Sequence, residues 1–120
     1  MSILVADDDP KLRALLEFRL RNDYDVTVAE DGQECWEYLD SHRVDPPDVV
    51  VLDVMMPGLD GYRVLDRMEA DEQFDAVDVI MLTSRGTEED VVRALESGAT
   101  DYMTKPFSPN ELAARIERVL

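Results

Sequence analysis

Several residue types are scarce in this sequence of 120 residues. There is a single cysteine, Cys35, so no internal disulfide can form, which fits a reducing compartment. The apolar runs extend over only a handful of residues, whereas a membrane-spanning helix needs about 20. The amino terminus has no basic stretch and runs into the carboxylates of residues 7–9, which is not typical of a signal peptide. We therefore expect a cytoplasmic protein without membrane association.

Basic residues are also few. The sequence has 12 of them against 28 acidic residues, for a formal net charge of −16, and the only lysines are Lys11 and Lys105. A surface of this sign repels phosphates, so we expect no direct binding to nucleic acid or to anionic membranes. This composition, with few lysines and many aspartates, is similar to that of proteins from salt-loving organisms. We therefore interpret most of the negative charge as a halophilic adaptation of the surface.

The hydrophobic fraction of 45% is high enough for a folded core. Short apolar runs occupy residues 3–6, 26–29, 49–52, 79–82 and, more weakly, 102–104. Between them lie stretches with apolar residues at helical spacing. Continuous apolar strands that alternate with helices predict a parallel sheet covered on both faces. The sequence therefore predicts one α/β domain over residues 1–120, with five strands in a doubly wound, three-layer arrangement.

Polar side chains follow four of the predicted strands: Asp7, Asp8, Asp53, Thr83 and Lys105. Because ligands of open parallel sheets bind at the carboxyl ends of the strands, we expect these side chains to form one site. Asp9 precedes Pro10 and is interpreted as a helix cap.

The chemistry of these side chains favours a metal and a phosphoryl group. Three neighbouring carboxylates repel one another, and a hard cation such as Mg²⁺ relieves this repulsion while leaving positions for phosphate oxygens. Lys105 and Thr83 add a positive charge and a hydroxyl donor. Asp53, in the central strand, is the natural acceptor for an acyl phosphate.

With these residues in place, the sequence resembles the receiver domain of two-component response regulators over essentially its whole length. Residues 53–61 (Asp-Val-Met-Met-Pro-Gly-Leu-Asp-Gly) are similar to the phosphorylation loop of that family. Asp7 and Asp8 resemble its acidic pair, Thr83-Ser84 its switch hydroxyl, and residues 105–107 (Lys-Pro-Phe) its lysine and following proline. The resemblance implies a flavodoxin-like (βα)5 fold with strand order 2-1-3-4-5.

The resemblance also implies the role of each site residue. Asp53 would be the phosphoryl acceptor. The Mg²⁺ ligands would be Asp8, Asp53 and the main-chain carbonyl of Met55, with Asp7 acting through water. Lys105, Thr83 and Ser84 would bind the phosphoryl group, Thr83 and Tyr102 would move as a switch, and the Lys105–Pro106 peptide bond would be cis.

As a member of that family, the chain would take a phosphoryl group from a sensor histidine kinase or a phosphotransfer protein. It would signal to an output domain or a downstream protein through the last two helices and the strand between them, a surface that could also form a homodimer. It would not be an enzyme, since it would catalyse only its own phosphorylation and dephosphorylation. The sequence leaves open whether the domain is free-standing or part of a longer regulator.

Two alternative functions stay open from the residues alone, and a third is disfavoured. A haloacid dehalogenase-like phosphohydrolase would carry an aspartate two residues after the nucleophile, where Met55 stands. An interaction module without phosphorylation would not need the intact set of site residues. An FMN-binding flavodoxin is disfavoured by the acidic residues 7–9. Arg85 is interpreted as pairing with Glu88 or Glu89, and His42 as a solvated helix end.

Overall fold

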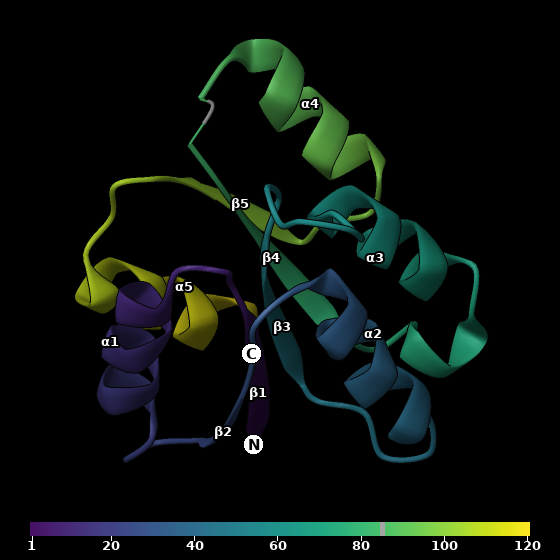
Figure 1. Cartoon of the computed structure of the whole chain (residues 1–120), viewed down its shortest axis with the longest axis horizontal. Helices are drawn as coiled ribbons and strands as arrows, with labels where there is room; N and C mark the ends of the chain where they lie inside the picture. Colours follow the sequence, from purple (N-terminus) through teal and green to yellow (C-terminus); the bar gives the residue numbers. More distant parts are fainter. Residues whose placement is uncertain (85) are drawn as a thin grey trace.

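The computed structural model describes residues 1–84 and 86–120, and over these ranges five parallel strands form one sheet between two layers of helices (Figure 1). The strands are β1 (Ser2–Ala6), β2 (Asp25–Ala29), β3 (Val49–Asp53), β4 (Asp78–Thr83) and β5 (Asp101–Thr104). Their order in the sheet is β2-β1-β3-β4-β5. The predicted fold class and strand order are therefore confirmed.

The helices lie on both faces of this sheet. They are α1 (Pro10–Leu20), α2 (Gly32–Ser41), α3 (Gly61–Glu69), α4 (Glu88–Glu96) and α5 (Pro109–Val119), with a short 3-10 turn, η1 (Glu72–Phe74). Helices α1 and α5 cover one face, and α2, α3 and α4 lie on the other (Figure 1). The sequence pattern did not predict η1, which is only three residues long. None of the helices in the described ranges is long and apolar enough to cross a membrane.

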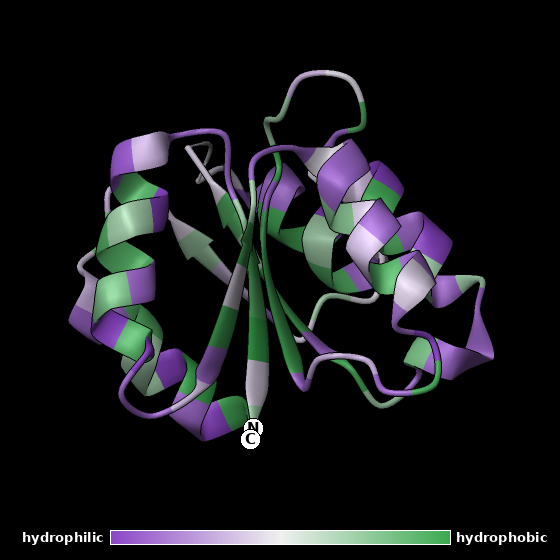
Figure 2. Cartoon of the chain, turned by 60° about the horizontal axis from the view of Figure 1, so that its bottom comes forward, coloured by the Kyte–Doolittle hydropathy of each residue, from purple (hydrophilic) through white to green (hydrophobic). Residues whose placement is uncertain are grey.

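Apolar residues on both faces of each central strand explain why the sheet is buried. In β1, Ile3 and Val5 pack with α1 and α5, whereas Leu4 and Ala6 pack with α2 and α3. Hydrophobic residues run along the central strands, while the helices alternate hydrophobic and hydrophilic residues around their axes (Figure 2). The continuous apolar runs in the sequence therefore correspond to strands covered by helices on both sides.

Side-chain caps fix where the helices begin. The side chain of Asp9 accepts a hydrogen bond from the amide of Lys11 at the start of α1, as predicted for a cap. Ser108 accepts a hydrogen bond from the amide of Glu111 at the start of α5, with an N···O distance of 3.1 Å. Asp60 caps α3, a cap that the sequence pattern did not single out. Each cap satisfies an amide that has no partner within the helix.

We predict that Asp31→Ala lowers the free energy of unfolding by about 1 kcal/mol, because Asp31 caps α2. Its carboxylate accepts a hydrogen bond from the amide of Glu34 at 2.8 Å, and alanine cannot replace this acceptor. Chemical denaturation measures the change. Gln33→Ala, at an exposed position two residues further on, is the matched control and should stay within about 0.5 kcal/mol of the parent. Equal effects of the two substitutions would contradict the capping role.

Candidate functional site

The carboxyl ends of four strands bring the predicted polar residues to one edge of the sheet. Asp7 directly follows β1, and Asp53 is the last residue of β3. Thr83 is the last residue of β4, and Lys105 directly follows β5. Thr83 is paired with Thr104 in the β4–β5 ladder, and the amide of Lys105 donates to the carbonyl of Thr83 at 2.6 Å. The register of the parallel strands therefore places these residues at the same end of the sheet.

Three carboxylates form the acidic part of the site. One ligand oxygen from each of Asp7, Asp8 and Asp53 lies within 4.8 Å of the other two. Asp7 is completely buried and Asp53 is 3% exposed, whereas Asp8 faces solvent. Hard oxygen ligands so close together fit a divalent cation such as Mg²⁺, which accepts carboxylates together with water. Asp7, Asp8 and Asp53 could therefore hold a metal ion.

Lys105 joins two of these carboxylates. Its Nζ atom donates a hydrogen bond to Oδ2 of Asp7 at 2.8 Å and lies 3.3 Å from Oδ2 of Asp53. The other oxygen of Asp7 accepts a hydrogen bond from the amide of Asp9 at 2.9 Å. The peptide bond between Lys105 and Pro106 is cis, the isomer that the family resemblance implies. A positive charge thus lies directly between the two buried carboxylates.

Burial and neighbouring charges shift the protonation of this pair. Burial and, to a lesser extent, the charge of Asp7 raise the pKa of Asp53, while Lys105 lowers it, and together these effects bring the pKa to about 6. Burial on its own would lower the pKa of Lys105, but the hydrogen bond to Asp7 and the charge of Asp53 outweigh this effect, so the pKa of Lys105 is raised. Lys105 therefore carries its positive charge at neutral pH, while Asp53 is ionised at a cost in free energy.

We predict that the metal-free protein loses stability as the pH rises through the pKa of Asp53. The folded-state pKa of about 6 exceeds the ordinary value of 3.8, so the folded state binds more protons than the unfolded state between these values. The free energy of unfolding should therefore fall by about 2 to 3 kcal/mol between pH 4 and pH 6 on account of this group. Denaturation in EDTA measures the free energy of unfolding of the parent and of Asp53→Asn at each pH, and the difference between the two isolates the contribution of Asp53. A difference that does not vary over this pH range would contradict the raised pKa.

The loop after β3 brings its backbone close to Asp53. The amide of Met55 lies 3.3 Å from Oδ1 of Asp53, and the Met55 side chain is 57% exposed. The amide of Gly61 donates to the carbonyl of Val54 at 3.0 Å. A Cβ atom on Gly61 would overlap the carbonyl oxygen of Asp53, so only glycine fits here. The loop therefore closes against the end of β3 and fixes the start of α3 beside Asp53.

The residues predicted to act as a switch lie in different environments. Thr83 is 2% exposed, and Tyr102 is half-buried against the core on the α2, α3 and α4 side. Ser84, which is predicted to bind the phosphoryl group, is exposed. Arg85, which is predicted to pair with Glu88 or Glu89, lies outside the residues that the structure describes.

His42 lies away from this site, at the end of α2. Its ring is half-buried and stacks on Tyr38 with 3.9 Å between ring centroids. Its Nδ1 atom lies 2.7 Å from the carbonyl oxygen of Tyr38. His42 is thus a packed helix end and less solvated than expected.

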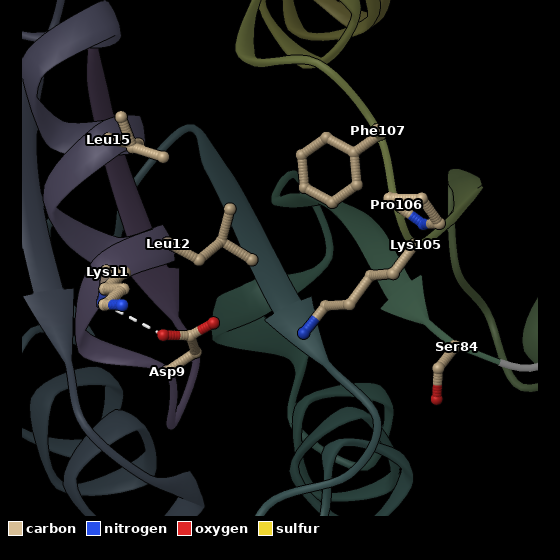
Figure 3. Close-up of a pocket in the computed structure, with 8 residues that line it drawn as sticks. All are labelled: Asp9, Lys11, Leu12, Leu15, Ser84, Lys105, Pro106 and Phe107. Carbon is tan, nitrogen blue, oxygen red and sulfur yellow. Dashed lines mark hydrogen bonds between the residues drawn. The ribbon is translucent and has the colours of Figure 1, made fainter.

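Two open pockets flank the site. One has a volume of about 450 Å³ and extends between α1 and the segment after β5. Leu12 and Phe107 face each other across this pocket, and the Lys105 side chain runs alongside them (Figure 3). The second, of about 480 Å³, is bordered by Asp8 and Met55. Lys105 therefore borders one open pocket, and Asp8 borders the other.

Sequence reasoning missed Arg13, which supports the acidic cluster from α1. Its Nη1 atom donates to the main-chain carbonyl of Asp7 at 2.7 Å, and its Nη2 atom lies 3.9 Å from a carboxylate oxygen of Glu30. Long side chains on a helix point back toward its amino terminus, and α1 begins at Pro10 beside the site. The position of Arg13, one turn into this helix, is the signal that could have indicated the contact.

Comparison with known proteins identifies the family. The profile of the family described as the response regulator receiver domain matches residues 3–117. The chain belongs to this family. Receiver domains are the parts of two-component response regulators that are phosphorylated on an aspartate, and they interact with histidine kinases and output domains. They are not enzymes that act on a separate substrate.

Similar proteins include longer regulators and isolated receiver domains. The chain is 44% identical to the alkaline phosphatase synthesis transcriptional regulatory protein PhoP of Bacillus subtilis, over 98% of this chain and 48% of that protein. It spans about half the length of the curated relatives it matches.

Two solved receiver domains have the same fold. The receiver domain of the Francisella response regulator 1452 matches with a TM-score of 0.87 and 36% identity, over 98% of this chain and 94% of that one. The BeF3-activated receiver domain of DrrB matches with a TM-score of 0.83 and 33% identity, over the same shares of the two chains.

Proposed function

We propose that residues 1–120 form a receiver domain in which Asp53 accepts a phosphoryl group from a sensor histidine kinase or phosphotransfer protein. The observation that carries this proposal is the position of Asp53, which is nearly buried at the end of the central strand. Its carboxylate lies 3.3 Å from the Lys105 ammonium. One of its oxygens lies within 4.8 Å of a carboxylate oxygen of Asp7 and of Asp8. In the transfer, a carboxylate oxygen bonds to phosphorus as the P–N bond of phosphohistidine breaks. The electron pair of that bond remains on the imidazole nitrogen.

The donor set supports Mg²⁺ as the cofactor. Asp8, Asp53 and the main-chain carbonyl of Met55 would bind it directly, and Asp7 would act through water. When bound, Mg²⁺ would neutralise the carboxylate charges and offer positions to phosphoryl oxygens. Lys105 already contacts Asp53 and would hold the phosphoryl group from the other side. Phosphoryl transfer depends mainly on such positioning and charge neutralisation.

The phosphoryl group would then act on the surface formed by α4, β5 and α5. Thr83 and Ser84 would donate hydrogen bonds to it, and Tyr102 would move inward as Thr83 moves. The new group adds roughly −1.5 to −2 of charge at the site, which favours a second packing of these elements. Slow transfer of the phosphoryl group to water would end the signal.

The same surface would carry the output signal to an output domain or a downstream protein, or would join two copies in a homodimer. Val92 and Leu95 on α4 are 43% and 51% exposed, which gives this surface an apolar part that a partner could cover. The net charge of −16 supports a domain that does not itself bind nucleic acid. The single cysteine supports a cytoplasmic location, and the excess of carboxylates supports a surface adapted to high salt.

A titration with beryllofluoride, which imitates a phosphoryl group on aspartate, tests the proposal. With Mg²⁺ present, the fluorine NMR spectrum should show a bound species that saturates at one per chain, and the melting temperature should rise. Without Mg²⁺, or in Asp53→Asn, no bound species should form. Binding that persists in either control would contradict the assignment of Asp53. Turnover of small phosphate esters at an enzyme's rate would favour a phosphohydrolase.

A further inference from the structure

Helix α4 is held by few buried side chains. Ala94 is its only buried residue within the part of the chain that the structure describes, and the larger Val92 and Leu95 face solvent. In Figure 1 the helix lies at one edge of the molecule, beyond α3. A helix with so little buried apolar surface can change position at low cost. The few specific contacts that it makes therefore decide where it lies.

Tyr62 of α3 makes two of these contacts. This residue is 6% exposed, and its hydroxyl donates a hydrogen bond to the carbonyl of Asp90, in the first turn of α4, at 3.3 Å. The guanidinium of Arg93 lies over the Tyr62 ring, with its Cζ atom 3.9 Å from the ring centroid. Because Arg93 is exposed, this cation–π contact is a modest attraction. One side chain thus binds both the backbone and a side chain of α4.

The other end of α4 also touches α3. Gly98, just after the helix, has a positive φ of 103°, and a Cβ atom there would overlap the carboxylate of Glu69. Glu69 is the last residue of α3. The chain just after α4 thus lies against the end of α3, and Tyr62 supplies a hydrogen bond and a cation–π contact between the two helices.

Tyr62 is closely connected to Asp53 through the backbone. It follows Gly61, whose amide donates a hydrogen bond to the carbonyl of Val54 and where a Cβ atom would overlap the carbonyl oxygen of Asp53. The amide of Val54 in turn donates to the carbonyl of Leu82 in β4 at 2.9 Å. The backbone next to Tyr62 is therefore anchored at the end of β3, whichever way α4 moves.

We infer that Tyr62 is a positioning residue that holds α4 in the arrangement of the unphosphorylated domain. The inference rests on the proposed function, in which Thr83 moves toward the phosphoryl group. Helix α4 begins at Glu88, five positions after Thr83, so its first turn would follow that movement and leave the anchored Tyr62. Contacts present in only one of two states favour that state. Loss of the Tyr62 contacts should thus favour the phosphorylated arrangement.

The test is the dissociation constant of beryllofluoride in the presence of Mg²⁺. Tyr62→Phe keeps the ring under Arg93 but removes the hydroxyl, and it should bind beryllofluoride about fivefold more tightly than the parent. Tyr38→Phe is the matched control, because Tyr38 is a half-buried tyrosine of α2 that stacks on His42 and not on α4. Its affinity should equal that of the parent. Fluorine NMR measures all three constants.

A second variant tests the ring contact. Arg93→Gln removes the guanidinium from an exposed position, where loss of folding is not expected, and should tighten binding by roughly threefold. An unchanged affinity in both variants, with only a lower melting temperature, would show a structural role and overturn the inference. Weaker binding would also overturn it, since the contacts would then belong to the phosphorylated arrangement. If the parent itself fails to bind beryllofluoride, the proposed function fails before the variants are compared.

Discussion

Lys105→Met is expected to lower the free energy of unfolding of the metal-free protein by about 2 kcal/mol at pH 7. The substitution leaves the fully buried Asp7 and the nearly buried Asp53 without the ammonium that now lies within 2.8 and 3.3 Å of them. Removing one partner of a buried ion pair costs about 3 to 5 kcal/mol, and the partial exposure of Lys105 reduces this value. The deficit should shrink as the pH falls, because protonated carboxyls no longer need the cation.

The same substitution should slow phosphorylation by acetyl phosphate about 100-fold, since it removes the charge that would stabilise the transferring group. Lys11→Met is the matched control. Lys11 is the other lysine of the chain and lies beside the same pocket as Lys105, but the hydrogen bond that it donates to Asp9 comes from its main-chain amide. Lys11→Met should leave both the stability and the rate close to those of the parent. Equal losses in the two variants would show that loss of a positive charge anywhere on this surface explains the effect.

Asp8→Asn is expected to weaken Mg²⁺ binding by roughly 100-fold, because it removes one negative charge and one carboxylate ligand from the site. Asp8 is exposed, and its side chain does not belong to the buried core. The metal-free stability should therefore stay the same or rise, since Asp8 no longer repels the other two carboxylates. Calorimetric titration with Mg²⁺ and denaturation in EDTA measure the two effects separately.

Asp9→Asn removes the same charge at the neighbouring residue. The Asp9 carboxylate caps α1 and does not belong to the group of three oxygens that could hold a metal, and asparagine is also a good cap. Its Mg²⁺ affinity should remain within about threefold of that of the parent. A loss as large as that of Asp8→Asn would mean that the net charge of the loop governs affinity, and would contradict direct ligation by Asp8.

The strands could be predicted from the sequence because their apolar runs are continuous, and a sheet covered on both faces requires such runs. The strand order could not be derived from the pattern of runs and came from the family resemblance. The turn η1 was missed because one short turn has no apolar period of its own. The cap of α3 by Asp60 was missed because that residue stood within the loop already interpreted as part of the site.

The composition of the site followed from the sequence for a similar reason. In a parallel sheet, the residue after each strand lies at the same edge, so Asp7, Asp53, Thr83 and Lys105 could be grouped without coordinates. Contacts that depend on where a side chain points were beyond this argument. Arg13 reaches back from the first turn of α1, and Tyr62 reaches from α3 to α4. Both directions depend on how the helices pack, which spacing along one helix does not reveal.

The most direct test of the central claim is the intact mass of the chain after incubation with acetyl phosphate and Mg²⁺. We predict the addition of one phosphoryl group, with the properties of an acyl phosphate that hydroxylamine cleaves, located on Asp53 by peptide mapping. The addition should require Mg²⁺ and should be absent in Asp53→Asn. A phosphoryl group on another residue of the parent protein, or no Mg²⁺-dependent addition at all, would contradict the assignment of Asp53 as the acceptor.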